Sequence, residues 1–298
     1  ESHHDGPTAQ APTPTRIPDM TLAGTARLAA LLLGTMIVSG CGGAAGDSGT
    51  QASEALAARL NRPARFQIGL GSTAVADIQS QGIAPDIYDR YLVGVGSGSW
   101  TGWNSPPGSY VGKVASDAAS IGAIPMYTLY QMASNGDGNL SGLDDASFMR
   151  EYWNNVTLLF QQLGSYGKPA IVNFEPDFWG YAQRQAPGGD PARLPAQVRI
   201  DPDCADLTDD VVGVAGCLLR SARKYAPKVA TGFPVSAWGA DSTGSVVAFM
   251  NAIGASQADM IIMSTLDRDA GCFESAPQPA DCQRSSAGLY WDETNKTR

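Results

Sequence analysis

A carboxylate with aromatic neighbours follows a short apolar run near the middle of the chain. Residues 170–172 are typical of a buried strand, and the chain continues as Asn173-Phe174-Glu175-Pro176-Asp177. Pro176 ends the strand because proline has no N–H to donate to a neighbouring strand. Glu175 is therefore expected at the carboxyl end of a strand, where α/β barrels place their chemistry. The alternative is a structural glutamate that pairs with an arginine or caps a loop.

Histidine is almost absent from the chain. The two histidines, His3 and His4, both lie upstream of a predicted export signal. The rest of the chain therefore lacks the histidine of Ser-His-Asp and Cys-His nucleophile systems, and the imidazole ligands of zinc or iron sites. Acid–base chemistry would fall to carboxylates or tyrosines. We expect no metal and no cofactor.

Residues 20–41 have the organisation of a secretory signal. A basic start with Arg27 is followed by an apolar stretch over 28–38 and then by small residues. This stretch is too short to span a bilayer. The ending Val-Ser-Gly-Cys resembles a bacterial lipoprotein signal, which makes Cys41 the predicted lipidation site. An ordinary signal peptide that contains a cysteine is the alternative.

This signal sets the expected domain organisation. Residues 1–19 are interpreted as an upstream, non-native stretch, and residues 42–62 as a flexible tether with a short helix over 54–60 that Ser53 caps. Residues 63–298 are expected to fold. The protein is predicted to be exported to the bacterial cell envelope and to be held at the membrane by its lipid anchor.

The remaining cysteines predict two disulfides. An exported chain can keep disulfides, and local pairing would close two short loops. We therefore expect Cys204 to bond to Cys217 and Cys272 to bond to Cys282, with free buried thiols as the alternative.

The net charge of the chain excludes some classes of binding partner. It carries 29 acidic residues against 20 Lys and Arg, a formal net charge of −9, and it has no basic run. Such a chain is not expected to bind nucleic acid or polyanionic substrates. A neutral ligand is expected instead.

Six apolar runs alternate with segments of helical periodicity. This alternation predicts a parallel sheet covered by helices. Asp144 and Asp241 are the predicted helix caps. The expected strands cover 66–71, 90–95, 124–130, 170–175, 229–234 and 260–265, and the expected helices cover 108–121, 144–163, 207–225 and 241–253.

The strand ends favour a barrel over an open dinucleotide-binding sheet. The first strand ends in Gly69-Leu70-Gly71-Ser72, which lacks the third glycine of a dinucleotide fingerprint. Polar and aromatic residues follow most strands, as in a barrel whose strand ends share one site. The predicted fold class is α/β, a (β/α)8 TIM barrel. Only six units precede Arg298, so the barrel is expected to be truncated after its sixth strand.

An exported barrel with Asn173-Phe174-Glu175-Pro176 at its fourth strand end resembles the (β/α)8 glycoside hydrolases of the two-glutamate retaining clan. Those enzymes carry the acid/base glutamate directly after an asparagine at the end of strand four, so the resemblance implies that Glu175 is the acid/base. Here Phe174 separates the two residues, and one inserted residue reverses the face to which Asn173 points. The clan's nucleophile lies on strand seven, which this chain does not reach.

Glycoside hydrolysis needs two carboxyl groups, about 5–5.5 Å apart for retention or about 6.5–9.5 Å for inversion. Apolar neighbours would raise the pKa of Glu175 toward that of a proton donor. Asp267, after the sixth strand, is the reachable second catalytic carboxylate, and Asp177 is expected chiefly to hold its loop. Aromatic side chains near the strand ends are expected to stack on sugar rings. For each of them, ordinary burial in the core is the alternative. The predicted substrate-binding residues are Trp100, Trp103, Tyr130, Gln131, Asn173, Asp177, Trp179, Tyr181 and Trp238.

These patterns lead to one expected function and one alternative. We expect a lipid-anchored, glycoside hydrolase-like protein that cleaves glycosidic bonds in a polysaccharide by carboxylate acid/base catalysis. The alternative is a non-catalytic surface lipoprotein that binds carbohydrate on the same barrel. A carboxylate at the tip of a seventh or eighth strand would favour the enzyme.

Overall fold

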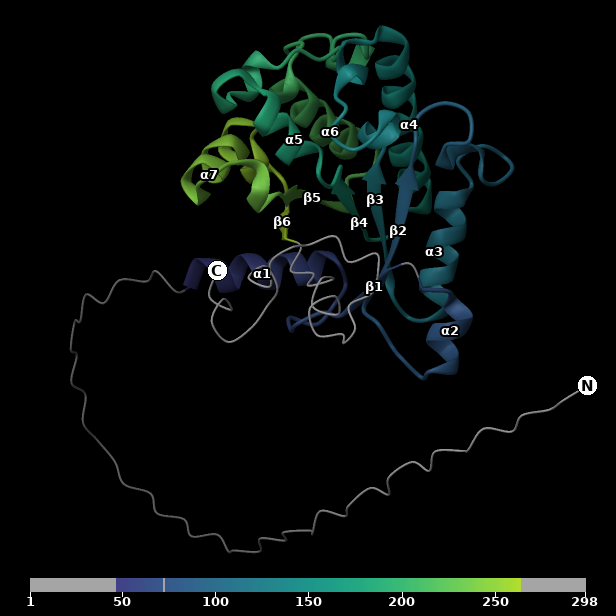
Figure 1. The fold of residues 1–298 in the computed structure, drawn as a ribbon. Coiled ribbons are helices and arrows are strands. Elements are labelled where there is room, and N and C mark those ends of the chain that lie inside the picture. The colour runs from purple at the N-terminus through teal and green to yellow at the C-terminus, as the bar shows by residue number, and fades with distance from the viewer. Residues whose placement is uncertain (1–46, 72, 264–298) are drawn as a thin grey trace, which may run out of the picture. The chain divides into compact units, whose positions relative to one another are not determined.

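The computed structural model describes residues 47–71 and 73–263, and within them six parallel strands form a half-barrel (Figure 1). The strands pair in the order in which they occur along the chain. The predicted parallel α/β sheet is therefore confirmed, whereas closure into a (β/α)8 barrel stays a prediction. The strands are β1 (Gly69–Gly71), β2 (Ile87–Val93), β3 (Ile124–Tyr130), β4 (Ala170–Phe174), β5 (Val229–Val235) and β6 (Met260–Met263).

Helices connect the strands, as the periodicity predicts, and two short ones were not foreseen. The helix caps lie one residue beyond the expected positions: Asp145 and Ser242, in place of Asp144 and Asp241, accept hydrogen bonds from backbone N–H groups of the first turn. The unforeseen helices are α2 (Val75–Ser80) and α5 (Phe178–Gln185). The others are α1 (Asp47–Arg59), α3 (Tyr110–Ser120), α4 (Ala146–Tyr166), α6 (Val211–Tyr225) and α7 (Thr243–Ala252).

No helix in the described ranges has both the length and the apolar character needed to cross a membrane.

Strand β2 begins earlier than the apolar run indicates. The sequence predicts 90–95, but pairing with β3 starts at Ile87. Asp86, just before the strand, accepts hydrogen bonds from Arg65 at 2.9 and 2.7 Å and from the backbone N–H of Ile68 at 3.0 Å. This ion pair satisfies a nearly buried carboxylate at the strand start. Because β2 begins at Ile87, Asp89 lies within the strand.

Alternate residues of the strands lie on two faces of the sheet. On the outer face, Phe174 packs 6.3 Å from Phe160 of α4, and Tyr127 donates a hydrogen bond of 2.7 Å to the carbonyl of Val111 on α3. The intervening positions therefore face the inside of the half-barrel. The inner face of the central strands includes Thr128 and Asn173, which are paired in the β3–β4 register.

Helix α1 closes the lower end of the half-barrel. Leu60 is 7% exposed and forms an apolar cluster with Ile124, Ile171 and Ala230, which are the lowest inner-face positions of three strands. Figure 1 shows α1 beneath the ends at which the strands begin. The expectation of a flexible tether over 42–62 is corrected for its described part, because residues 47–59 form a helix that packs on the sheet.

Two polar contacts add to this packing. Arg59 forms an ion pair of 2.6 Å with Asp259, and Arg62 donates to the carbonyl of Gly122 at 2.8 Å. Ser53 does not cap α1: it lies within the helix, and its hydroxyl donates to the carbonyl of Thr50 at 2.9 Å. The helix begins seven residues earlier than expected, at Asp47 rather than Glu54.

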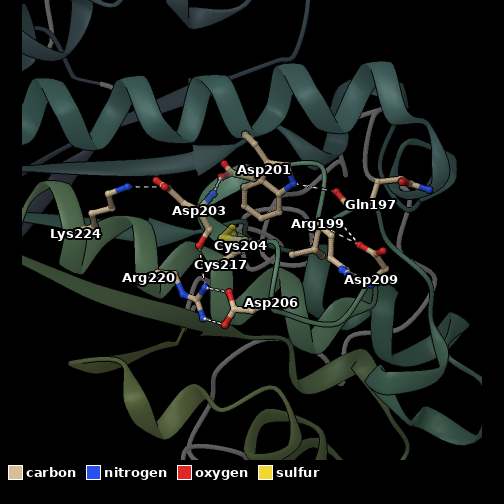
Figure 2. The surroundings of a disulfide bond; sticks show 12 residues. Gln197, Arg199, Asp201, Asp203, Cys204, Asp206, Asp209, Cys217, Arg220 and Lys224 are labelled. Atoms are coloured by element: carbon tan, nitrogen blue, oxygen red, sulfur yellow. Dashed lines mark hydrogen bonds and ion pairs between the residues drawn. A yellow bond between two sulfur atoms is a disulfide. The ribbon is translucent and has the colours of Figure 1, made fainter.

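A disulfide joins Cys204 to Cys217 of α6, which confirms the predicted local pairing. Figure 2 shows it between two ion pairs, Lys224 with Asp203 and Arg220 with Asp206, which hold the same loop against α6. Both cysteines are fully buried. The predicted lipidation site Cys41 and the predicted pair of Cys272 and Cys282 lie outside the described residues.

We predict that Leu60→Ala lowers the free energy of unfolding by about 2–4 kcal/mol, because it leaves a cavity at the lower end of the half-barrel. Urea denaturation measures the change. Val247→Ala is the matched control, since Val247 is 51% exposed and should change stability by no more than about 0.5 kcal/mol. Equal midpoints for Leu60→Ala and the wild type would show that residues 47–62 are a tether after all.

We predict that the double variant Cys204→Ser/Cys217→Ser loses about 3 kcal/mol of stability, because the bond closes a loop with a sequence separation of 13. Thermal unfolding of the oxidised wild type and the variant measures this loss. Reduction of the denatured wild type should reproduce it. A variant as stable as the oxidised protein would contradict the prediction.

Candidate functional site

The carboxyl of Glu175 lies behind the inner face. Strand alternation would place this side chain inside the half-barrel after Asn173. Instead the backbone turns at Glu175, with φ of 53°, and again at Asp177, with φ of 67°. Non-glycine residues seldom adopt this left-handed region. As a result Oε2 of Glu175 accepts hydrogen bonds from the N–H groups of Gln131 at 2.9 Å and Met132 at 3.0 Å.

Complete burial changes the acidity of this group. Removal from water raises the pKa of Glu175 to about 8, against the opposing effects of the amides of Met132 and Gln131 and of the Tyr152 hydroxyl. The carboxyl is therefore protonated at neutral pH. It has the acidity expected of a proton donor, but it is 0% exposed and touches no surface from which a ligand could take the proton.

A buried polar cluster surrounds Glu175. The side-chain carbonyl of Gln131 accepts hydrogen bonds from Trp100 at 3.2 Å and from Asn155 at 2.8 Å. Trp100 and Gln131 are both 0% exposed. Their predicted contact with substrate is therefore corrected: in the described structure they support the ends of β2 and β3 from the helix side.

Trp179 is also a core residue. It is 1% exposed, its ring packs 5.0 Å from Phe233, and its indole N–H donates to the carbonyl of Phe174 at 2.7 Å. Neither face of the ring is available to a sugar, so the predicted stacking role is corrected to one of packing.

The inner face carries a polar row that the sequence analysis found only in part. The Thr128 hydroxyl donates to Oδ1 of Asp89 at 2.9 Å, and the Asn173 amide donates to Thr128 at 3.4 Å. Asn173 is 6% exposed, and its carbonyl oxygen has no hydrogen-bond partner. Burial raises the pKa of Asp89, against the opposing effects of Thr128 and Arg90. We call Asp89, Thr128 and Asn173 the inner-face row.

A glycine lies on the neighbouring strand at each end of the inner-face row. Gly71 of β1 is paired with Asp89, and a Cβ added there would lie 3.4 Å from Oδ2 of Asp89. Gly232 of β5 is paired with Asn173, and a Cβ added there would lie 2.6 Å from the Ile262 side chain. The Asp89 end of the row is thus flanked by backbone, whereas the Ile262 side chain fills the space at the Gly232 position.

Tyrosines and carboxylates form a rim above the row. The rings of Tyr91 and Tyr130 meet edge to face at 5.7 Å, and Tyr91 is 42% exposed. The Tyr130 hydroxyl donates to Asp137 at 2.7 Å. Burial raises the pKa of both tyrosines, and the nearby charge of Asp177 raises it further. Tyr130, Asp137, Asp177 and Tyr181 line one small surface pocket.

The remaining aromatic predictions fall in two places. Tyr181 packs 4.6 Å from Trp238, over which the Arg184 guanidinium lies at 5.5 Å, so these rings extend the rim toward α5. Trp103 is 44% exposed but packs on Tyr110 at 5.0 Å at the start of α3. The structure therefore brings Tyr130, Asp177 and Tyr181 together in one pocket, packs Trp238 on Tyr181, and places Trp103 beside α3.

Two residues of the row, Asp89 and Thr128, were not predicted from the sequence. Asp89 precedes the strand predicted at 90–95, and Thr128 lies inside the apolar run predicted as the strand 124–130. Ile87, Asp89, Tyr91 and Val93 occupy every second position, so in a strand that begins at residue 87 they share one face. This period-two pattern is the signal that could have identified Asp89. The predicted catalytic residue Asp267 lies outside the described residues. Within the described part of the chain, no three His, Cys, Asp or Glu side chains gather as a metal site would need.

We predict that Glu175 makes stability depend on pH. Unfolded, it titrates near 4.5; folded, near 8. Its contribution is therefore complete below about pH 4.5 and is lost as the pH rises to about 8, by at most about 1.4 kcal/mol per pH unit. Glu175→Gln accepts the same N–H bonds and cannot ionise. Urea denaturation across this window should show the wild type losing stability relative to the variant, and parallel curves would contradict the assignment.

No protein-family model matches the chain, and no curated protein matches its sequence. Among solved structures it is similar to the endoglucanase Cel6 from Mycobacterium tuberculosis, determined in complex with methyl-cellobiosyl-4-deoxy-4-thio-β-D-cellobioside. The identity is 20%, the TM-score is 0.38, and the match covers 64% of this chain and 55% of that one. The chain thus spans about half the length of that endoglucanase. The resemblance to a glycoside hydrolase is loose and assigns no activity.

Proposed function

We propose that the chain binds a glycan on the inner face of the half-barrel and is a glycoside hydrolase-like protein. The observation that carries this proposal is the inner-face row beneath the tyrosine rim. A nearly buried asparagine presents an unpaired carbonyl oxygen there, and Thr128 links this asparagine to the partly exposed carboxylate of Asp89. A buried acceptor without a partner is costly unless something binds it. A ligand that reaches the row would supply the missing donor.

The chemistry of the rim fits a sugar. Sugar rings offer C–H groups that pack on aromatic faces, and Tyr91, Tyr130, Tyr181 and Trp238 lie around the same strand ends. Polar groups that converge at the base of an aromatic rim are the usual composition of a ligand site. Strand ends of a parallel barrel are also where such sites form.

Hydrolysis requires a second carboxyl group beside Asp89. We assign that role to Asp267, which follows β6 in the sequence, and we assign Glu175 to holding the β3–β4 strand ends rather than to proton transfer. The alternative function is binding without cleavage, through the same row and rim. Export and lipid anchoring at Cys41 belong to the same proposal, because they would place the site where polysaccharides occur.

We predict that Asp89→Asn weakens glycan binding by about tenfold or more, because a charge-assisted hydrogen bond contributes about 1.5–3 kcal/mol. Isothermal titration calorimetry with oligosaccharides found in a polysaccharide screen gives the affinity, and release of reducing ends gives turnover. Asp89→Asn should abolish turnover if the protein is an enzyme.

Asp117→Asn is the matched control. Asp117 pairs with Lys113 at 2.6 Å on the exposed side of α3 and should leave binding unchanged. Equal losses in both variants, or undiminished binding by Asp89→Asn, would refute a site at the row. Binding that depends on Asp89 without any turnover would favour the non-catalytic function.

A further inference from the structure

The hydrogen bonds of the inner-face row all run in one direction. Thr128 has a single hydroxyl proton, and it donates that proton to Asp89 at 2.9 Å. Asn173 must therefore turn its N–H toward the Thr128 oxygen, which it does at 3.4 Å. This order fixes the amide orientation without reference to any ligand. Both hydrogen bonds of the row therefore run toward Asp89, and the second N–H of the Asn173 amide takes no part in them.

Two acceptor oxygens of the row remain to face a ligand. The carbonyl oxygen of Asn173 has no partner, and Oδ2 of Asp89 lies beside Gly71, where no side chain intervenes. Asn173 is more than nine-tenths buried, so its unpaired oxygen is not satisfied by bulk water. A sugar hydroxyl both donates and accepts, whereas an ammonium group only donates. The donor-only group is therefore the better complement to this row.

The charged side chains on the inner face and around the small pocket above it are carboxylates. Asp137 and Asp177 lie on the rim above Asp89. Among the described strand residues, the inner-face positions include no lysine or arginine. Arg90, adjacent in sequence to Asp89, occupies the opposite face of β2, where its guanidinium lies 4.2 Å from the ring of Tyr88. A cation would be attracted to the row, and an anionic sugar would be repelled.

We propose that the sugar held by the inner-face row carries a free, protonated amino group, as in a glycan of deacetylated amino sugars. The inference rests on the proposed glycan site and names its substrate class. The ammonium group would donate to Oδ2 of Asp89 and to the carbonyl oxygen of Asn173. N-acetylation removes the positive charge of the ammonium group and two of its three N–H donors. A hydroxyl at the same position of the sugar offers one O–H donor and no charge.

The test compares three oligosaccharides of equal length on the full chain by isothermal titration calorimetry, at a mildly acidic pH. They are β-1,4-linked glucosamine, its N-acetylated form and the corresponding glucose oligomer. We expect the glucosamine oligomer to bind about tenfold or more tightly than the other two, because each charge-assisted hydrogen bond is stronger than a neutral one. The neutral oligomers should still bind through the rim.

Two variants locate the preference. Asp89→Asn and Asn173→Ala should each reduce the affinity for the glucosamine oligomer while changing that for the glucose oligomer less, and Asp117→Asn should leave the preference intact. Thermal unfolding confirms that each variant is folded.

Three outcomes overturn the inference in distinguishable ways. Equal or tighter binding of the glucose or N-acetylated oligomer refutes the amino-sugar preference and leaves the proposed glycan site standing. Binding of none of the three refutes the glycan site, and the inference with it. A preference that persists unchanged in both row variants also overturns the assignment to this row.

Discussion

A buried carboxyl group at the end of β4 determines how the strand ends are arranged. One carboxyl oxygen of Glu175 accepts hydrogen bonds from the backbone N–H groups of Gln131 and Met132, the residues that begin the connection after β3. That connection reaches β2 as well, because the Ser134 hydroxyl accepts from the N–H of Val95 at 2.9 Å. One side chain thus links the ends of three neighbouring strands. Its left-handed backbone is retained because these contacts, made away from water, outweigh the conformational cost.

The half-barrel interior is layered from bottom to top. Helix α1 seals an apolar layer of Ile124, Ile171 and Ala230, and the inner-face row lies on the strands above it. Polar groups at this depth need partners, since water has limited access. The row supplies most of them internally and leaves the carbonyl oxygen of Asn173 without one. The aromatic side chains of the rim border the row, so hydrogen-bonding groups and aromatic rings lie close together at the strand ends.

The sequence predicts the elements of the fold better than it predicts the site. Continuous apolar runs identified all six strands, because buried parallel strands leave few alternatives. Burial of individual aromatic residues was not predictable: Trp100 and Trp238 both follow strands, yet one is 0% and the other 38% exposed. The orientation of Glu175 depends on a positive φ that no residue type announces. Asp89 was missed because a charged residue interrupts the apolar pattern by which a strand is recognised.

The packing of α1 has a consequence for how the chain folds. Arg59 and Asp259, which pair at the end of this helix, are separated by 200 positions in the sequence. The helix is synthesised first, but its docking surface exists only after β3, β4 and β5 have paired. Contacts between such distant segments form late and slow the folding of a domain. The apolar lower layer should therefore stay uncovered during assembly, and α1 should dock as the last step of folding.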